Sequence, residues 1–269
     1  MSPAPKEYDA TLFAGTAKYY SKYRIGYPGD LFDALYRHSS FESANPVLDL
    51  GCGTGHVAIG LAEKGIIVYA VDPDPEMVAE GVRAASQRNL TTIRWMLGTD
   101  RQIGDMKLPA LSVCTMGASF HWMDRSRVLK QLDGMIVSDG CVALFSGRFD
   151  LEHAETALWN QLASEVIQKF LGPERRAGKG TYSHSSTRHG EILAESPFGK
   201  LQTLYFKKRI LLTVEQIVGL QLSMSFASPA QLGSAKKEFE SVLTEQLTKA
   251  TDKPAFESVV QYELIIGKR

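Results

Sequence analysis

The sequence predicts an α/β fold in which a mostly parallel sheet of seven strands carries helices on both faces. Apolar runs of strand length alternate with helical patterns through residues 46–145, and three glycines at alternate positions follow the first run. Such alternation is typical of βαβ units with right-handed crossovers, whose strands run parallel. The 269 residues suffice for one large domain with an insertion, so we expect a single domain over 1–269.

Strands are expected where short apolar runs are bounded by polar or turn-forming segments. The first five runs are separated by helical patterns or turns, and the last two follow a long insertion. The expected strands cover 46–50, 66–71, 91–96, 111–116, 141–145, 204–212 and 258–267.

Helices are expected where apolar residues recur with helical spacing, or where a side-chain oxygen can cap the first free backbone N–H groups. The expected helices include a tyrosine-rich stretch ending at Lys22, followed by 31–38, 57–64, 75–88, 125–135 and 151–171. The expected caps are Asp30, Thr213 in a capping box with Gln216, and Ser228 before Pro229.

Charge and cysteine content narrow the classes of function. The 30 basic and 30 acidic residues leave no net charge, so no global field would gather nucleic acid. Cys52, Cys114 and Cys141 lack a C-x-x-C spacing, which disfavours a zinc site and a disulfide framework. The N-terminus lacks an apolar signal core, and no stretch approaches the ~20 apolar residues that span a bilayer. We expect a soluble, cytoplasmic protein.

The turn after the first strand is the most informative segment. Gly51, Gly53 and Gly55 let the backbone turn sharply beside a ligand, and a helix N-terminus with free N–H groups follows them. Asp49 precedes the glycines and would repel a pyrophosphate, so a cation or zwitterion is expected there. Asp72 ends the next strand, where a carboxylate can accept hydrogen bonds from both ribose hydroxyls.

This acid-x-Gly-x-Gly-x-Gly pattern, with its second acid, resembles the first motif of the class I S-adenosylmethionine-dependent methyltransferases. The resemblance implies a Rossmann-like sheet whose last hairpin makes one antiparallel pair. It also implies S-adenosylmethionine as cofactor, S-adenosylhomocysteine as product, and no metal. The alternative is an NAD-binding domain, whose fingerprint spaces its glycines G-x-G-x-x-G. That fingerprint fits less well, because position 56 is His and Asp49 has no role in it.

The resemblance also assigns further cofactor contacts. Pro73, with Met77 behind it, would lie against the adenine face, and the Gly117 carbonyl would hold the methionine ammonium. Either Thr99 or Asp100 would accept a hydrogen bond from the adenine amine.

The N-terminal run at 19–28 resembles the opening motif of a small-molecule subgroup of this family. There Arg24 would clasp the cofactor carboxylate, and Tyr20 would wall the sulfonium. Residues 1–30 are therefore expected to cover the cofactor.

A Phe-His-Trp sequence after strand four resembles the same subgroup. It places His121, followed by Trp122, between cofactor and acceptor, where His121 could act as a general base. The alternative is a structural role, in which His121 bonds a neighbouring loop.

The β/α alternation stops after strand five, and 147–200 is expected to form a substrate lid between strands five and six. Its stretch at 172–180 is basic and is expected to be a mobile loop. Arg175 and Arg176 would there meet an anionic acceptor, or else lie in solvent. His184 and His189 lack an acidic partner at a metal-ligand spacing and are assigned to a solvated polar loop.

We therefore expect methyl transfer to an O, N or C atom of a small organic molecule by direct in-line displacement. The alternatives are a non-catalytic S-adenosylmethionine-binding protein and an RNA methyltransferase. An RNA methyltransferase is disfavoured by the neutral net charge and by the absence of an Asn/Asp-Pro-Pro-aromatic motif after strand four. Transfer of the aminocarboxypropyl arm is a further enzymatic variant. The sequence pattern identifies neither the methyl acceptor nor the oligomeric state.

Overall fold

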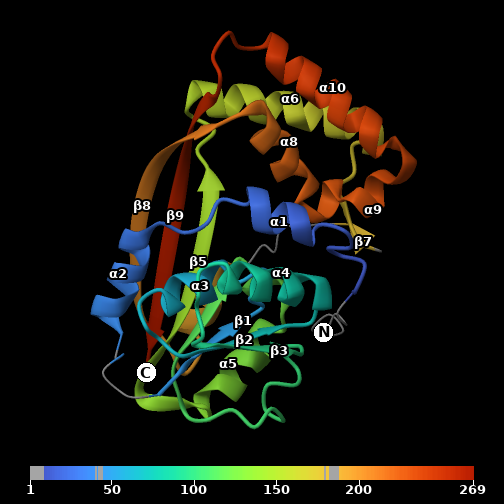
Figure 1. Ribbon diagram of the computed structural model, residues 1–269. Coiled ribbons are helices and arrows are strands. Elements are labelled where there is room, and N and C mark those ends of the chain that lie inside the picture. The colour runs from blue at the N-terminus through green and yellow to red at the C-terminus, as the bar shows by residue number, and fades with distance from the viewer. Residues whose placement is uncertain (1–8, 40, 42–44, 179, 182–187) are drawn as a thin grey trace.

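One mixed sheet of seven strands organises the computed structural model, which describes residues 9–39, 41, 45–178, 180–181 and 188–269 (Figure 1). The strand order is β3-β2-β1-β4-β5-β9-β8, and a short β6–β7 hairpin lies apart from this sheet. The bounds are β1 (Val47–Leu50), β2 (Val68–Asp72), β3 (Ile93–Leu97), β4 (Leu111–Gly117), β5 (Ile136–Phe149), β6 (Arg176–Ala177), β7 (Gly180–Thr181), β8 (Lys200–Leu212) and β9 (Phe256–Lys268).

The predicted fold class is confirmed, with one difference in pairing. Strands β1 to β5 pair in parallel, and β9 is antiparallel both to β5 and to β8. The last strand therefore makes two antiparallel pairs where one was expected, because it enters the sheet between two strands that precede it. Strand β5 is also much longer than the apolar run at 141–145, because it begins at Ile136 beside Leu111 of β4 and continues to Phe149 along β9.

Helices cover the two faces of the sheet with separate cores. One core joins α2 (Gly29–His38) and α3 (His56–Ala62) to one face, and α4 (Pro75–Ser86) packs against β2 and β3. The other core joins α5 (Arg125–Asp133) and α7 (His189–Ala194) to the opposite face. The predicted Asp30 cap is wrong: helix α2 has Pro28 as its N-cap without a side-chain cap, and Asp30 lies in its first turn.

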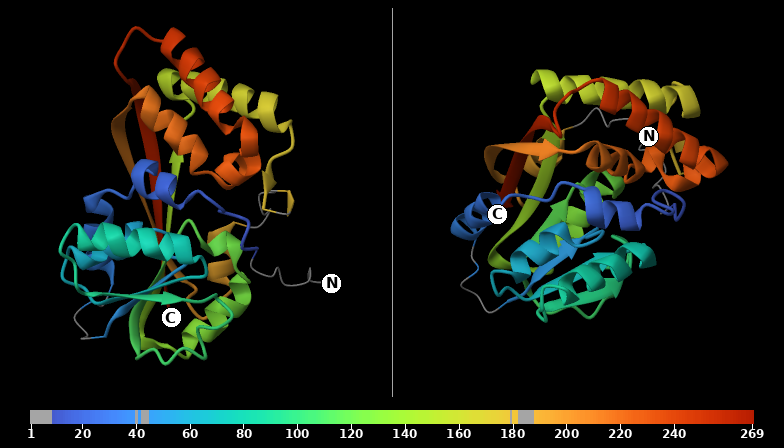
Figure 2. Two further views of the ribbon diagram at one scale, coloured as in Figure 1. Left: turned by 45° about the vertical axis from the view of Figure 1, so that its right-hand side comes forward. Right: turned by 45° about the horizontal axis from the view of Figure 1, so that its top comes forward.

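A helical lobe stands at the far end of the long strands β5, β8 and β9 (Figures 1 and 2). It has its own core around Trp159, Phe239 and Phe256. Only α6 comes from the expected insertion at 147–200; the other helices come from the β8–β9 connection. The lobe helices are α6 (Ala154–Leu171), α8 (Val214–Leu222), α9 (Pro229–Leu232) and α10 (Lys236–Lys249).

The N-terminal helix α1 (Ala17–Tyr23) lies between this lobe and the sheet, where it contacts α8 and α4. Glu215 of α8 accepts hydrogen bonds from the Tyr23 hydroxyl at 2.7 Å and from the Lys22 ammonium at 3.0 Å. The chain that precedes β1 is thereby attached to the chain that follows β8. In the described part of the protein, no helix combines the length and apolar character needed to cross a membrane.

Candidate cofactor and acceptor site

The turn between β1 and α3 can be built only from glycine at its tightest points. Gly51, Gly53 and Gly55 all have positive φ angles, of 69°, 53° and 83°. A Cβ atom on Gly55 would lie 2.4 Å from Cη2 of Trp95, and one on Gly51 would lie 2.5 Å from Cβ of Ser119. Gly51 and Gly55 are therefore required by packing inside the protein, whereas a Cβ atom on Gly53 would enter open space.

Replacing Gly55 with alanine should destabilise the protein. We expect the free energy of unfolding to fall by about 2 to 4 kcal/mol, since a left-handed backbone is combined with overpacking against Trp95. Urea denaturation would measure the change. Gly29→Ala is the matched control, because open space surrounds Gly29. The double variant with Trp95→Phe should recover part of the loss, and no recovery would contradict the steric explanation.

Asp72 fastens the turn to the end of β2. Its carboxylate accepts hydrogen bonds from the backbone N–H groups of Gly53 at 2.8 Å and Asp74 at 2.9 Å. Burial is the largest influence on its pKa and raises it to about 6. A carboxylate oxygen can accept more than one hydrogen bond, so these contacts leave acceptor capacity for a ligand.

Asp49 is fully buried behind the turn. It accepts a hydrogen bond from the Thr115 hydroxyl at 2.9 Å and another from the Ala58 backbone N–H at 3.1 Å. Asp49 thus ties β1 to β4 and to the first turn of α3. Burial raises its pKa to about 7.

The pKa of Asp49 predicts a pH-dependent stability. Because it lies above the ordinary value of 3.8, the folded protein is most stable with this group protonated and loses stability as the pH rises toward about 7. Asp49→Asn keeps an acceptor for Ala58 and offers a donor to Thr115 without this titration. We expect the variant to gain unfolding free energy relative to wild type between about pH 5 and pH 8. Urea denaturation at both pH values tests this, and a constant difference would contradict it.

A cavity of about 100 Å³ lies between the glycine turn, the N-terminal segment and the upper parts of β5 and β9. Its opposite wall is mainly apolar and includes Phe149, Leu220 and Val260. Six residues that the sequence predicted for the cofactor line it: Tyr20, Arg24, Asp49, Gly51, Gly53 and Gly117.

Arg24 brings an available cationic donor to this cavity. Its guanidinium lies over the Tyr20 ring, 4.8 Å from the ring centre, and its Nη2 is 3.5 Å from the Ser223 carbonyl oxygen. The Nε atom is buried and has no hydrogen-bond partner among the residues that the structure describes. A buried unpaired donor of this kind is costly, and an anionic ligand would satisfy it.

Comparison with known proteins agrees with this geometry. Residues 47–140 match a family model described as a methyltransferase domain. An uncharacterized methyltransferase of Mycobacterium tuberculosis is 28% identical over 229 residues, which cover 83% of this chain and 82% of that protein. These matches support a class I S-adenosylmethionine-dependent methyltransferase.

Two other matches define the extent of the likeness. A trans-aconitate 2-methyltransferase of Mycobacterium tuberculosis is 35% identical over 98 residues, 34% of this chain and 33% of that protein. The structure of a putative type II methyltransferase from Anaeromyxobacter dehalogenans superposes with a TM-score of 0.63 and 21% identity, and the match covers 91% of this chain and 97% of that chain. The second match supports the fold of the whole methyltransferase chain.

The residues expected near adenine lie at the ends of β2 and β3, outside the lining of the cavity. Met77 is buried in the first turn of α4, and Pro73 is half-buried beside it. Thr99 bonds Gln102 Oε1 through its backbone N–H at 2.9 Å and its hydroxyl at 3.2 Å. Asp100 accepts a hydrogen bond at 3.4 Å from the backbone N–H of Asp124. Thr99 and Asp100, the two residues expected to bond the adenine amine, therefore already make hydrogen bonds within the protein.

The exit from β4 carries the Phe-His-Trp segment in a constrained backbone. Ala118 has a φ angle of 50°, and its N–H donates to the Phe145 carbonyl at 2.9 Å. The Ser119 hydroxyl donates to the Leu50 carbonyl at 2.7 Å. A non-glycine residue in this region stores strain that the neighbouring bonds must balance. The 3-10 helix η1 (Phe120–Trp122) therefore starts from a fixed point beside the glycine turn.

His121 and Trp122 do not line the cavity at the turn. Their rings lie 4.6 Å apart, and His121 also stacks on His189 at 6.2 Å with an interplanar angle of 23°. Nδ1 of His189 is 3.4 Å from Nη1 of Arg125, and burial is the main cause of its lowered pKa.

The assignment of His189 to a solvated loop is therefore wrong. His189 is half-buried at the start of α7, where α5 and α7 pack together. No sequence signal links residues so far apart in the chain. His184 lies outside the described residues.

Within the basic stretch and just after it, Arg176–Ala177 and Gly180–Thr181 pair as the antiparallel β6–β7 hairpin. Arg175 lies over the Phe226 ring of the lobe, 5.0 Å from its centre. Arg176 belongs to β6, and both arginines are exposed. In the described residues, no group of three or more His, Cys, Asp and Glu side chains is placed to hold a metal ion.

Proposed function

We propose that this methyltransferase methylates an O, N or C atom of a small organic molecule by direct in-line displacement. When bound, S-adenosylmethionine supplies a methyl group on a positively charged sulfur. Transfer of this methyl group to an electron pair of the acceptor would leave the electrons of the broken carbon–sulfur bond on sulfur, with S-adenosylhomocysteine as the product. The protein therefore has to align the two reactants and exclude water.

The observation that carries this proposal is the cavity at the glycine turn, with the unpaired Nε of Arg24 on one side and an apolar wall on the other. Arg24 would bind the cofactor carboxylate, and the Gly117 carbonyl would accept from its ammonium group. Tyr20 would face the sulfonium. The apolar wall then remains for the acceptor, which suits a small organic molecule better than a nucleic acid.

The adenosine half would lie along the ends of β2 and β3. Asp72 would accept from the ribose hydroxyls, and Gly55 would let the backbone pass close to the ligand. Pro73 and Met77 would contact the adenine face, with Thr99 or Asp100 at its edge. Asp49 has no exposed surface, so it would act through its charge and by fixing α3.

The lobe and the N-terminal segment would close over the reacting groups. Residues 147–200 supply only part of this cover, and α8 to α10 supply the rest. The ties between α1 and Glu215 would make both parts move together. An anionic acceptor would meet Arg175 and Arg176 at the rim. Closure of this kind excludes water from the transfer.

Arg24→Gln provides a test of the carboxylate contact. We expect S-adenosylhomocysteine to bind about tenfold to thirtyfold more weakly, since one charge-assisted hydrogen bond is lost. Isothermal titration calorimetry measures this. Lys18→Gln is the matched control, because it removes the same charge from an exposed side chain of α1. Equal affinity in both variants would remove Arg24 from the site.

The function itself is tested by incubating the protein with S-adenosylmethionine and a panel of small acids, phenols and amines. Mass spectrometry should find S-adenosylhomocysteine together with an acceptor heavier by one methyl group. Release of methylthioadenosine would instead indicate transfer of the aminocarboxypropyl arm. Tight uptake of a nicotinamide coenzyme, with none of S-adenosylmethionine, would contradict the proposal.

A further inference from the structure

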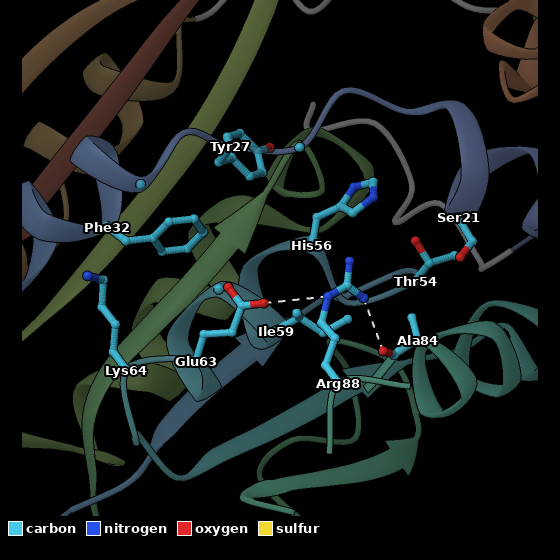
Figure 3. A pocket seen from close by; sticks show the side chains of 13 residues that line it. Ser21, Tyr27, Phe32, Thr54, His56, Ile59, Glu63, Lys64, Ala84 and Arg88 are labelled. Carbon is cyan, nitrogen blue, oxygen red and sulfur yellow. Dashed lines mark hydrogen bonds and ion pairs between the residues drawn. The ribbon is translucent and has the colours of Figure 1, made fainter. Parts of the chain in front are cut away.

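A second, larger cavity lies on the outer side of α3 and plays no part in the proposed reaction. Its volume is about 380 Å³, within the range that small-molecule sites occupy. The segment before α2 covers it, and α3 and the end of α4 form its other walls (Figure 3). Its lining includes polar residues (Ser21, Thr54, His56), apolar residues (Tyr27, Phe32, Ile59) and charged residues (Glu63, Lys64, Arg88).

One end of this cavity offers hydrogen-bond donors. The Arg88 guanidinium lies between Glu63 and His56 (Figure 3). It donates to the Ala84 carbonyl at 3.0 Å and has its Nε 3.5 Å from a Glu63 oxygen, contacts that occupy only part of its five N–H donors. Thr54 is only 2% exposed, and its buried hydroxyl has no hydrogen-bond partner within the described chain.

The charged side chains around this end are the Arg88 guanidinium and the carboxylate of Glu63, which form an ion pair. Burial and the nearby guanidinium groups of Arg24 and Arg88 lower the pKa of His56 to about 4, so its imidazole is neutral near pH 7. Lys64 lies nearer Phe32 (Figure 3) and pairs with Asp33, so the spare N–H donors of Arg88 are the groups that would attract an anion here. An anion bound between Arg88, His56 and Thr54 would gain charge-assisted hydrogen bonds in a partly enclosed space.

The other end of the cavity is apolar. The Phe32 ring packs directly on Gly60 of α3, where a Cβ atom would lie 2.3 Å from its Cζ. Tyr27 and Ile59 complete this wall. A ligand with its anionic group at Arg88 would therefore place an apolar body against Phe32.

We propose that this cavity binds a small carboxylate with a flat apolar body, of about the size of benzoate, as a ligand separate from both cofactor and acceptor. Thr54 belongs to the glycine turn, and His56 lines both cavities and stacks on Tyr20 at 5.7 Å. A ligand here would contact His56, which also lines the cofactor cavity, and would therefore act as an effector. Any effect on cofactor affinity must then be reciprocal.

Benzoate and acetate are the probes, titrated into the full chain by isothermal titration calorimetry. We expect saturable benzoate binding at one site, with acetate at least about tenfold weaker because it lacks the apolar body. Arg88→Gln should weaken benzoate at least about tenfold. Arg83→Gln, which removes the same charge from an exposed side chain of the preceding helix α4, should leave it unaltered.

Two further measurements separate this site from the cofactor site. Saturating S-adenosylhomocysteine should leave the benzoate stoichiometry at one, and complete displacement would overturn the proposal. In NMR titrations, benzoate should raise the pKa of His56, since an anion offsets the two guanidinium groups. The proposal also fails if benzoate does not saturate, or if Arg88→Gln and Arg83→Gln behave alike. None of these readouts depends on methyl transfer, so they stand apart from the test of the proposed function.

Discussion

Asp72→Ala should weaken the binding of S-adenosylhomocysteine by about a thousandfold, the largest effect that we expect on cofactor affinity. The estimate assumes two hydrogen bonds from the ribose hydroxyls to a carboxylate, each worth about 1.5 to 3 kcal/mol. The same substitution also removes the acceptor for the backbone N–H of Gly53, which lies 2.8 Å away. The glycine turn would then lose its attachment to β2, adding to the loss. Isothermal titration calorimetry measures the affinity.

Two variants separate these contributions. Asp72→Asn keeps an acceptor for Gly53 but removes the charge, so it should fall between wild type and Asp72→Ala. Glu76→Gln removes a charge from an exposed position nearby and should leave affinity unaltered. Thermal unfolding of each variant reports on the turn without cofactor. Unchanged affinity in Asp72→Ala would refute the ribose assignment.

The parts of the fold that depend on neighbouring residues could be predicted from the sequence. The capping box at Thr213 forms as expected, with its hydroxyl accepting from the Gln216 N–H at 3.2 Å. Ser228 likewise accepts from the Gln231 N–H at 3.2 Å. The prediction of Asp30 as a helix cap was wrong because Pro28, with its extended backbone, is the N-cap. Asp30 therefore lies inside the first turn of α2.

The parts that depend on distant packing could not be predicted. Strand β5 extends beyond its apolar run because β9 pairs with it through Phe149, and no local pattern announces a partner so far along the chain. The helical lobe combines two separate connections for the same reason. The glycine turn is different, since β1, α3 and β2 are contiguous and their spacing fixes Asp49 and Asp72 at one edge.

The site shows the same division between local and distant signals. His56 stands directly after the last glycine of the turn, yet its stacking on Tyr20 follows only from the fold of the N-terminal segment. His189 reaches His121 from α7, across the sheet face that α5 also covers. A single histidine forms no periodic sequence pattern. The contacts of His56 and His189 could therefore be found only in the structure.

The second large effect is expected at His121. If this imidazole takes the proton from the acceptor, His121→Gln should lower kcat by about a hundredfold or more while S-adenosylhomocysteine affinity stays unaltered. His153→Gln is the matched control, because His153 lies in the lobe and pairs with Glu257. The assay uses the acceptor that the mass-spectrometric screen identifies.

The position of His121 makes this experiment decide where the acceptor binds. His121 lies with His189 on the sheet face covered by α5 and α7, whereas the cavity at the turn opens toward Val260 and Leu220. A loss of kcat would require the acceptor to reach across the β4 exit to His121. If His121→Gln turns over at the wild-type rate, His121 is not the general base, and the acceptor binds at the apolar wall of the cavity. A loss of cofactor affinity instead would give His121 a structural role, since η1 adjoins Gly51 through Ser119.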